Sequence, residues 1–361
     1  MPNKFFPHET KNPSAVAAWL FLCCFLILCM ILLGGYTRLT HSGLSMVNWS
    51  PIMGVWPPLN TQQWLDLFAQ YRQFPEYRFV NHDMNLEGFK AIFWIEYAHR
   101  MLGRLIGIVF FLPFLVFLGT RKLTTGTAIR LSSIFLLGGL QGGMGWYMVK
   151  SGLINEPNVS QYRLAVHLFL AFVIYSMIFR TAMQMAARPA ERVGSMTGTK
   201  SGSGYQLPFR LLMGSLLVLI ISGGFMAGTR AGYIFNTFPR MGGEWIPAGL
   251  WSMQPAWKNI FENGITIQFT HRLLALMVFV FTCSFVLFVL SRFRTDVDVR
   301  RATLLTAGLL LVQLLLGVST LVLRVPVAFG VAHQAGAVAF LSALLYLRYR
   351  LDRSKSIRAG F

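Results

Sequence analysis

Four histidines lie near the starts of apolar segments and form two copies of one arrangement. In the first half of the chain His99 opens an apolar segment, and His167 opens another two segments later. In the second half His271 and His333 occupy the equivalent places. Paired imidazoles inside a membrane bundle are most simply explained as axial ligands of haem iron. The pattern therefore predicts two tetrapyrrole sites in one chain.

A purely structural role or a zinc site would suit these histidines less well. A single histidine could simply bind a neighbouring helix by a hydrogen bond, but four at duplicated positions make that role unattractive. Zinc would need further cysteines or carboxylates around the histidines, and the sequence offers no such cluster. A glycine-rich stretch at 138–145 would let a flat macrocycle approach closely. The same stretch could equally serve the ordinary packing of small residues between helices.

The residues around the first histidine of each pair differ in one respect. The two copies read Glu96-Tyr97-Ala98-His99-Arg100 and Gln268-Phe269-Thr270-His271-Arg272. On a helix Glu96 projects to the same face as His99, where a carboxylate can move protons or hold a reacting water. Gln268 has a similar shape but cannot ionise. We therefore expect a reactive site in the first half and an electron-handling site in the second. A structural Glu96, paired with Arg100 or Arg163, is the alternative.

Arg100 and Arg272 each follow a histidine directly, at a depth where a charged group needs a partner. The two propionates of a haem would suit a guanidinium fork. We therefore expect Arg100 to bind the first macrocycle and Arg272 the second. The alternative is that both side chains extend to the membrane interface.

The composition is that of a polytopic, all-helical membrane protein. The chain has 361 residues, of which 55% are hydrophobic and 12% charged, and its mean hydropathy is +0.54. Eight stretches are long and apolar enough to cross a bilayer. They are 15–36, 91–118, 128–149, 164–185, 209–229, 264–290, 302–323 and 328–347. All four cysteines lie within such stretches, so no structural disulfide is expected on the oxidising side.

The net charge of +19 is distributed in a way that disfavours nucleic-acid binding. If the N-terminus is cytoplasmic, the loops and tails on that side carry most of the lysines and arginines. This bias predicts that both termini lie in the cytoplasm. The N-terminus resembles neither a cleavable signal nor a transit peptide. The first apolar stretch is therefore expected to serve as the insertion signal.

The chain contains an internal repeat. At an offset of 189 residues, Gly34 matches Gly223 and Trp56 matches Trp245. Further along, an offset of 172 carries three more residues of the first half onto the second. These matches are His99 with His271, Gln141 with Gln313, and Gly145 with Gly317. Since each copy has four stretches, the repeat is parallel. It predicts two four-helix bundles with sites on facing helices.

Domain boundaries follow from the repeat. We expect an N-terminal bundle over 1–192, a flexible cytoplasmic linker over 193–207 and a C-terminal bundle over 208–361. The topology places all four histidines toward the outer leaflet. The large external loops 37–88 and 231–262 are positioned to cap the sites. Their tryptophans suit amphipathic lids at the interface, and they are Trp49, Trp56, Trp64, Trp245, Trp251 and Trp257.

Three segments carry a resemblance to a known family. They begin at Gly34-Gly-Tyr-Thr-Arg-Leu-Thr-His-Ser-Gly, at Glu96-Tyr-Ala-His-Arg-Met-Leu-Gly-Arg and at Gln268-Phe-Thr-His-Arg-Leu-Leu-Ala. The chain resembles the haem A synthase family over nearly its whole length, in the branch shared by alphaproteobacteria and mitochondria. The resemblance implies a bacterial inner-membrane oxidoreductase that converts haem O to haem A. The methyl group at ring position eight would be oxidised to a formyl group that terminal oxidases use.

The resemblance also implies roles for the predicted residues. His271 and His333 would hold a permanent haem b, while His99 and His167 would flank the substrate haem O. Glu96 would be the catalytic carboxylate. The methyl would be hydroxylated twice, and the gem-diol would lose water to give the aldehyde. Either molecular oxygen or water could supply the oxygen atom, and both routes would use Glu96 to handle protons.

Some features lie outside the resemblance or compete with it. Some bacterial relatives carry a cysteine pair in an external loop, whereas 37–88 has no cysteine here, so no redox role of such a pair carries over. Family resemblance alone suggests a haem O synthase and cytochrome oxidase assembly factors as partners, and an oligomer is compatible with it. The rival functions are a dihaem b-type cytochrome that exchanges electrons with quinone, and a transporter without haem.

Overall fold

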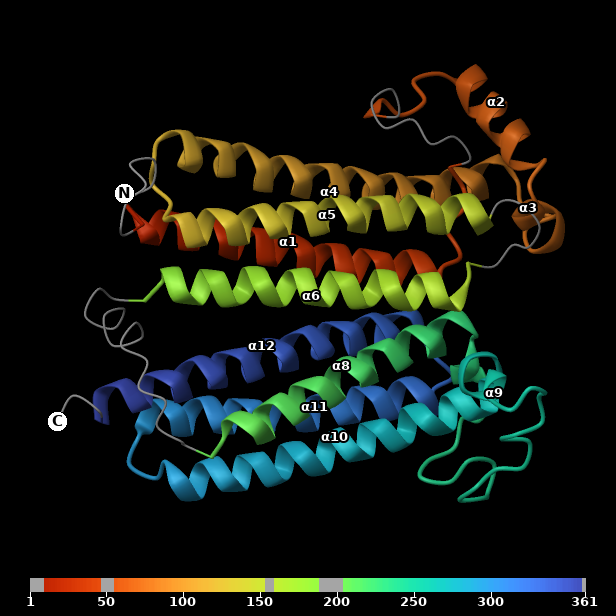
Figure 1. Cartoon of the computed structure of the whole chain (residues 1–361). Helices are drawn as coiled ribbons and strands as arrows, with labels where there is room; N and C mark the ends of the chain where they lie inside the picture. Colours follow the sequence, from red (N-terminus) through yellow and green to blue (C-terminus); the bar gives the residue numbers. More distant parts are fainter. Residues whose placement is uncertain (1–9, 47–54, 153–158, 188–203, 359–361) are drawn as a thin grey trace.

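The computed structural model describes residues 10–46, 55–152, 159–187 and 204–358, and all regular elements within them are helical apart from one isolated β-bridge. Eight helices of the described residues are longer than 20 residues and run side by side (Figure 1). They are α1 (Pro13–Leu39), α4 (Leu86–Gly119), α5 (Thr125–Gly152), α6 (Gln161–Met185), α8 (Gln206–Gly228), α10 (Gly264–Arg292), α11 (Val297–Val322) and α12 (Val327–Arg358). The predicted all-helical class is confirmed.

Seven of these long helices have the length and apolar composition needed to cross a membrane. The eighth predicted segment, 128–149, does form a helix, but α5 is not among the seven. Its lower apolar character has a plain cause, because Gln141 and the glycines of 138–145 replace larger apolar side chains. The predicted segments are otherwise found as helices, several of which extend past the predicted ends because the flanking polar turns are helical too.

Side-chain caps fix the starts of three of the long helices. The side chain of Asn85 accepts the Gly88 amide at the start of α4, and Asn263 accepts the Ile265 amide at the start of α10. Asp296 accepts the Val299 amide at the start of α11. Each cap satisfies one of the amides that the first helical turn leaves without a partner. The starts of α4 and α10 matter for function, because His99 and His271 lie on these two helices.

The first four long helices lie on one side of the molecule and the last four on the other (Figure 1). The two halves meet where α6 packs on α8 and on α12, and where α1 packs on α12. Arg38 at the end of α1 donates to the Ala227 carbonyl at 3.0 Å, at the C-terminal end of α8. The last carbonyls of a helix have no partner within it, so this cross-link ties the outer ends of the two halves together.

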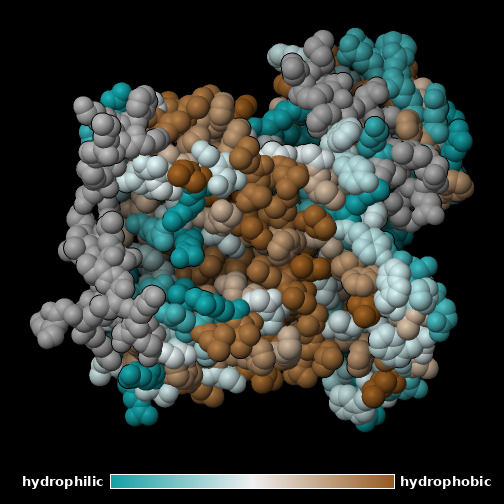
Figure 2. Space-filling view, viewed as in Figure 1, coloured by the Kyte–Doolittle hydropathy of each residue, from teal (hydrophilic) through white to brown (hydrophobic). Residues whose placement is uncertain are grey.

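A band of apolar side chains covers the middle of the molecule, and polar side chains collect over the loop between α1 and α4 (Figure 2). In that loop the short helices α2 (Thr61–Tyr71) and α3 (Pro75–Phe79) stand at the outer end of the bundle (Figure 1). Tyr71 packs on Phe89 of α4, with ring centroids 5.1 Å apart, and Trp64 packs on Phe93 at 4.9 Å. This aromatic cluster holds the loop against the start of α4.

The predicted tryptophan lids have mixed outcomes. Trp64 packs on α4, as a lid residue should. Four other tryptophans of the two loops are exposed, namely Trp56, Trp245, Trp251 and Trp257. Trp49 lies outside the described residues, and so does most of the predicted linker 193–207. The short elements η2 (Ala231–Tyr233) and α9 (Lys258–Glu262) belong to the second loop, at the same end of the bundle as α2 and α3 (Figure 1).

The contact between the halves gives a first prediction. A methyl group added at Gly224 of α8 would lie 2.6 Å from the Cα atom of Ala165 on α6, whereas one added at Gly214 of the same helix meets nothing within 4 Å. Gly224→Ala should therefore lower the free energy of unfolding by about 1–3 kcal/mol, because the backbones must move apart. Gly214→Ala should change it by less than about 1 kcal/mol. Thermal unfolding of both variants in detergent tests this, and equal melting temperatures would contradict it.

Candidate functional site

Each of the four predicted histidines lies against a glycine of a neighbouring helix. A methyl group added at the glycine would come within 2.9–3.6 Å of the imidazole in every case. The pairs are His99 with Gly34, His167 with Gly145, His271 with Gly223, and His333 with Gly317. A side chain would crowd the imidazole most strongly at Gly317 and less at Gly34 and Gly145, whereas a methyl group at Gly223 would make an ordinary contact. The two halves use equivalent pairs of helices for this contact.

The structure also brings the histidines together in the expected pairs. His99 on α4 is close enough to His167 on α6 to interact with it electrostatically, and His271 on α10 interacts with His333 on α12 in the same way. All four side chains are only partly buried. Among the described residues, no three histidines, cysteines, aspartates or glutamates are grouped as they would be around a bare metal ion. The histidines are therefore arranged as facing pairs.

The helices are loosely packed around these pairs. On α4 no residue between Glu96 and Phe110 is buried, although the helix is buried on both sides of that stretch. On α10 the corresponding unburied stretch lies between Gln268 and Val278, which are themselves buried. Helices in a close-packed bundle bury some residue in nearly every turn. Two such stretches contain a predicted ligand, and similar ones follow Ile134 on α5 and Leu310 on α11, the helices whose glycines contact His167 and His333.

Polar contacts of the imidazoles support the same interpretation. Gln141 donates to the His167 carbonyl at 3.1 Å and lies 3.3 Å from its ring. The Nδ1 atoms of His167 and His333 are buried and have no hydrogen-bond partner. A buried imidazole nitrogen without a partner is costly in a completed structure. The imidazole donors fit haem iron at both pairs, and His167 and His333 each keep one ring nitrogen without a protein partner.

The first imidazole of the second half has a contact that the first half lacks. The hydroxyl of Ser222 on α8 lies 3.1 Å from Nδ1 of His271. A hydrogen bond at Nδ1 fixes the ring and leaves Nε2 for a metal. At the offset of 189 residues the counterpart of Ser222 is Leu33, which has no hydrogen-bonding side chain.

Glu96 is buried at the centre of a hydrogen-bond network, with 2% of its surface exposed. One carboxylate oxygen accepts the Ser45 hydroxyl at 2.7 Å and the Met46 amide at 2.8 Å. The other pairs with Arg100 at 2.5 Å, and Arg100 also donates to the Met46 carbonyl at 2.8 Å. The carboxylate therefore fastens the end of the first loop to α4. Its pairing is with Arg100, as one alternative predicted, while Arg163 lies against Tyr147.

Gln268 makes the opposite kind of contact in the second half. Its amide nitrogen donates to the Phe235 carbonyl at 3.0 Å, and its buried amide oxygen has no partner. Arg272 donates to the same carbonyl at 3.0 Å and to the Thr237 carbonyl at 2.9 Å. Phe235 stands 189 residues after Met46, so both arginines grip the same point of their loops. Only the first half has a carboxylate beside this arginine, because Gln268 stands where Glu96 stands in the first half.

The arginines were predicted to bind propionates or to extend to the interface. The structure shows a further role, because both arginines tie a loop to a helix. The Nε atom of Arg272 is buried and has no partner, so one donor remains for an anionic group. The predicted contact of Arg100 and Arg272 with propionates stays a prediction.

A second buried carboxyl lies beside Glu96. Glu76 on α3 is 4% exposed and accepts a hydrogen bond from the Tyr71 hydroxyl at 3.3 Å. Burial, and next the charge of Glu96, raise the pKa of Glu76 to about 8. Sequence reasoning missed this residue, because nothing in its neighbourhood repeats in the second half. Ser45 and Ser222 were missed for the same reason.

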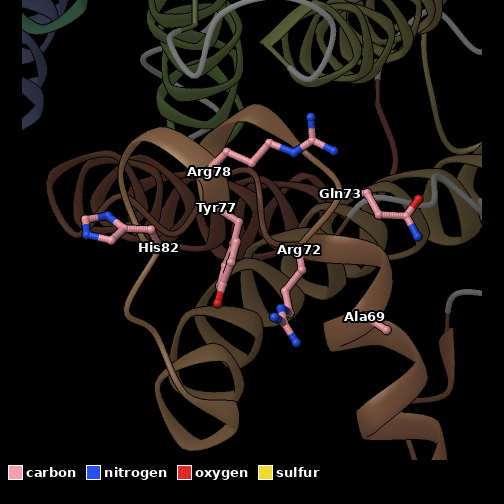
Figure 3. A pocket seen from close by; sticks show the side chains of 6 residues that line it. All are labelled: Ala69, Arg72, Gln73, Tyr77, Arg78 and His82. Carbon is pink, nitrogen blue, oxygen red and sulfur yellow. The ribbon is translucent and has the colours of Figure 1, made fainter.

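An open cavity of about 500 Å³ lies in the loop between α1 and α4 (Figure 3). It is lined by Ala69, Arg72, Gln73, Tyr77, Arg78 and His82. None of the predicted site residues is among them. The guanidinium of Arg72 lies over the Tyr77 ring, 5.6 Å from its centroid. The cavity is therefore a polar feature of the loop and does not belong to either imidazole pair.

Comparison with known proteins identifies relatives along the whole chain. A family model described as "Cytochrome oxidase assembly protein" (COX15-CtaA) matches residues 17–345. The chain is 46% identical to a "Heme A synthase" of Nitrosospira multiformis, covering 96% of this chain and 97% of the relative. It is 44% identical to a "Heme A synthase" of Azorhizobium caulinodans, covering 94% and 95%. It is also 44% identical to "Heme A synthase COX15" of Arabidopsis thaliana, covering 95% and 77%.

The glycine contacts generate a prediction about the second imidazole pair. A methyl group at Gly317 of α11 would lie 2.9 Å from the His333 ring, whereas one at Gly308 of the same helix meets nothing within 4 Å. Gly317→Ala should displace the imidazole and change the visible absorption of haem bound to the purified protein. Gly308→Ala is the matched control and should leave the spectrum unchanged. A wild-type spectrum from both variants would show that His333 is not an iron ligand.

Proposed function

Because the chain belongs to the COX15-CtaA family, we propose that it is a membrane-bound oxidoreductase that converts haem O to haem A. The family model covers most of the chain, and full-length relatives named heme A synthase are 40–46% identical to it. The resemblance noted in the sequence is thereby confirmed. The reaction oxidises the C8 methyl of the porphyrin to a formyl group, and the product serves terminal oxidases.

The observation that carries the proposal is the difference between Glu96 and Gln268, which otherwise occupy equivalent positions in the two halves. Glu96 and Gln268 both lie one turn before a histidine, and both contact the loop residue that the neighbouring arginine grips. Only Glu96 can accept or release a proton. A cytochrome that merely relays electrons between two haems needs no such difference. We therefore place the methyl oxidation in the N-terminal half and the permanent cofactor in the C-terminal half.

The proposed membrane arrangement has eight crossings, with α5 as the one that composition alone does not identify. It consists of two parallel four-helix bundles, 1–192 and 208–361, with a cytoplasmic linker over 193–207. The equivalent histidine–glycine contacts support this duplication. Both termini are proposed to lie in the cytoplasm of a bacterium and the two sites on the periplasmic side of the inner membrane. The loops with α2, α3 and α9 stand at that end of the bundle (Figure 1).

In the N-terminal half, His99 and His167 would flank the iron of haem O, and Arg100 would face its propionates. In the C-terminal half, His271 and His333 would hold haem b, with Arg272 toward its propionates. When bound, haem b supplies a one-electron carrier for the electrons that the oxidation removes. Ser222 holds the His271 ring from its far side. The loose packing around both pairs leaves room for the two macrocycles.

The protein's own groups prepare the N-terminal site for proton transfer. Ser45 and the Met46 amide hold one oxygen of Glu96, and Arg100 holds the other, so the carboxylate has a fixed orientation. The loop that covers it keeps bulk water away from a carboxylate that is 2% exposed. Glu96 can then exchange a proton with the oxidised methyl or its attacking water without first reorganising. Glu96 can transfer protons and still pair with Arg100, because the ion pair holds the carboxylate in one position during the transfer.

Family membership also supports a set of partners. The matching model describes assembly proteins of cytochrome oxidase, so we propose that the product passes to that assembly process. The substrate implies a haem O synthase upstream. The apolar surface of the long helices implies contact with membrane lipid.

Replacing Glu96 by glutamine tests the function directly. Glu96→Gln keeps the size of the side chain but removes the proton acceptor, so conversion of haem O should fall at least about a hundredfold. Haem bound in the second half should persist, because none of its ligands changes. Haem extracted from the purified protein after incubation with haem O shows both results. Unchanged conversion would exclude Glu96 as the catalytic carboxylate.

Two further variants control for the assignment of the halves. His271→Ala should abolish the haem b absorption, whereas His99→Ala should mainly impair conversion and leave that absorption in place. The reverse pattern would show that the substrate site and the haem b site have been assigned to the wrong halves. A colourless wild-type protein that is folded would exclude both the synthase and the cytochrome.

The contact of Ser222 with His271 predicts a change in redox potential. Removing the hydroxyl by Ser222→Ala makes the ring a weaker electron donor, so the ferric state loses stability and the potential of haem b rises. The loss of one hydrogen bond should raise it by about 20–60 mV. Ser215→Ala is the matched control on α8, since Ser215 donates only to Leu212 of its own helix. A redox titration that gives equal potentials for both variants and the wild type would contradict the contact.

A further inference from the structure

Glu76 and Tyr71 form a buried polar cluster that the mechanism above does not use. Tyr71 is fully buried, and its hydroxyl donates to Glu76 and accepts a hydrogen bond from Asn81 at 2.8 Å. These groups come from α2, α3 and the turn that follows α3. The cluster lies at the outer end of α4, where the rings of Tyr71 and Phe89 pack together. It therefore lies inside the loop, against the first turns of α4.

The cluster is electrostatically connected to the proposed proton acceptor. The charged groups that act on Glu76 are Glu96 of α4, which raises its pKa, and Arg38 of α1, which lowers it. The Tyr71 hydroxyl lowers it as well. Burial is the first cause of this raised pKa and the charge of Glu96 the second, so Glu76 is suited to hold a proton near neutral pH.

On its other side the cluster adjoins the open cavity of the loop. Each member of the cluster is followed in the sequence by a residue that lines the cavity. Arg72 follows Tyr71, Tyr77 follows Glu76, and His82 follows Asn81. The Tyr77 ring points into the cavity (Figure 3) and contacts the Tyr71 ring, with centroids 5.8 Å apart. The cluster and the lining of the open cavity are therefore neighbours along the chain and meet at the contact between the Tyr71 and Tyr77 rings.

The proposed reaction requires such a connection. Each hydroxylation of the methyl consumes protons if molecular oxygen supplies the oxygen atom, and releases them if water does. In both cases Glu96 must exchange protons with the aqueous phase after each step. Its own surroundings are closed, because Ser45, Met46 and Arg100 occupy both of its oxygens.

We propose that Glu76, together with Tyr71, exchanges protons between Glu96 and the cavity lined by Arg72, Tyr77 and His82. The inference rests on the proposed function. It assigns Glu76 as a second proton-transfer group of the N-terminal site. Glu76 takes a proton from Glu96, or returns one to it, and exchanges that proton with water in the cavity through the Tyr71 hydroxyl.

Infrared titration of the purified full-length protein tests the proposal without relying on turnover. The wild type should show the carbonyl band of a protonated carboxyl that disappears as the pH rises through about 8. Glu76→Gln should lack this band. Glu87→Gln is the matched control, since Glu87 is exposed at the start of α4 and pairs only with Lys90. That variant should keep the band, and a band that persists in Glu76→Gln would overturn the proposal.

Conversion of haem O supplies the second measurement. The wild-type rate should change near pH 8 as Glu76 loses its proton, and Glu76→Gln should lose this change and be at least about tenfold slower. Its haem b absorption should be that of the wild type. A wild-type rate and pH profile in Glu76→Gln would overturn the inference while leaving the function intact. A wild-type protein that converts no haem O would overturn the function, whereas the infrared titration would still report on Glu76.

A second variant keeps the test decisive if Glu76→Gln does not fold. Tyr71→Phe removes only the hydroxyl whose hydrogen bond lowers the pKa of Glu76. The infrared band should therefore titrate at a higher pH, and conversion should slow with haem b unchanged. An unshifted band together with wild-type conversion would show that Tyr71 and Glu76 do not act together.

Discussion

The close approach of an imidazole to a glycine is the contact on which both sites depend. Four helices present a histidine to the bundle interior, and each time the neighbouring helix has only a hydrogen atom where a side chain would stand. A methyl group would already come within 2.9–3.6 Å of the ring. The imidazoles therefore stay between the helices at a depth where they could not remain unless they were partnered. The unburied stretches of α4 and α10 beside them leave room for the flat ligand that we propose.

The difference between the halves is confined to a few atoms around this shared frame. Both arginines fasten a loop to a helix through the same carbonyl position, at Met46 and Phe235. The carboxylate of Glu96 accepts an amide there, whereas the amide of Gln268 donates to a carbonyl. Nearly identical surroundings thus hold the carboxyl of Glu96, which can lose a proton, and the neutral amide of Gln268. The hydroxyl of Ser222 adds a fixed imidazole to the neutral half only.

The sequence was sufficient for the parts of this arrangement that repeat or follow a helical period. The two pairs of histidines and the repeated glycines follow from spacing, whereas the pairing of Glu96 with Arg100 was only one of two alternatives to a catalytic role. The helical character of α5 could be predicted, but its glycines hide it from a criterion based on apolar composition. Ser45 and Glu76 could not be found, because their contacts with α4 depend on how a long loop folds back. Such contacts join residues far apart in the chain and leave no periodic signal.

The packing of α6 on α8 and of α1 on α12 joins the two halves as two subunits of a symmetric dimer would be joined. In a dimer of identical chains, any replacement appears at both sites at once. Because the two halves belong to one polypeptide, an acid can be kept at one site and lost at the other. A single polypeptide thus allows two equivalent positions to carry different groups, an acid at Glu96 and a neutral amide at Gln268.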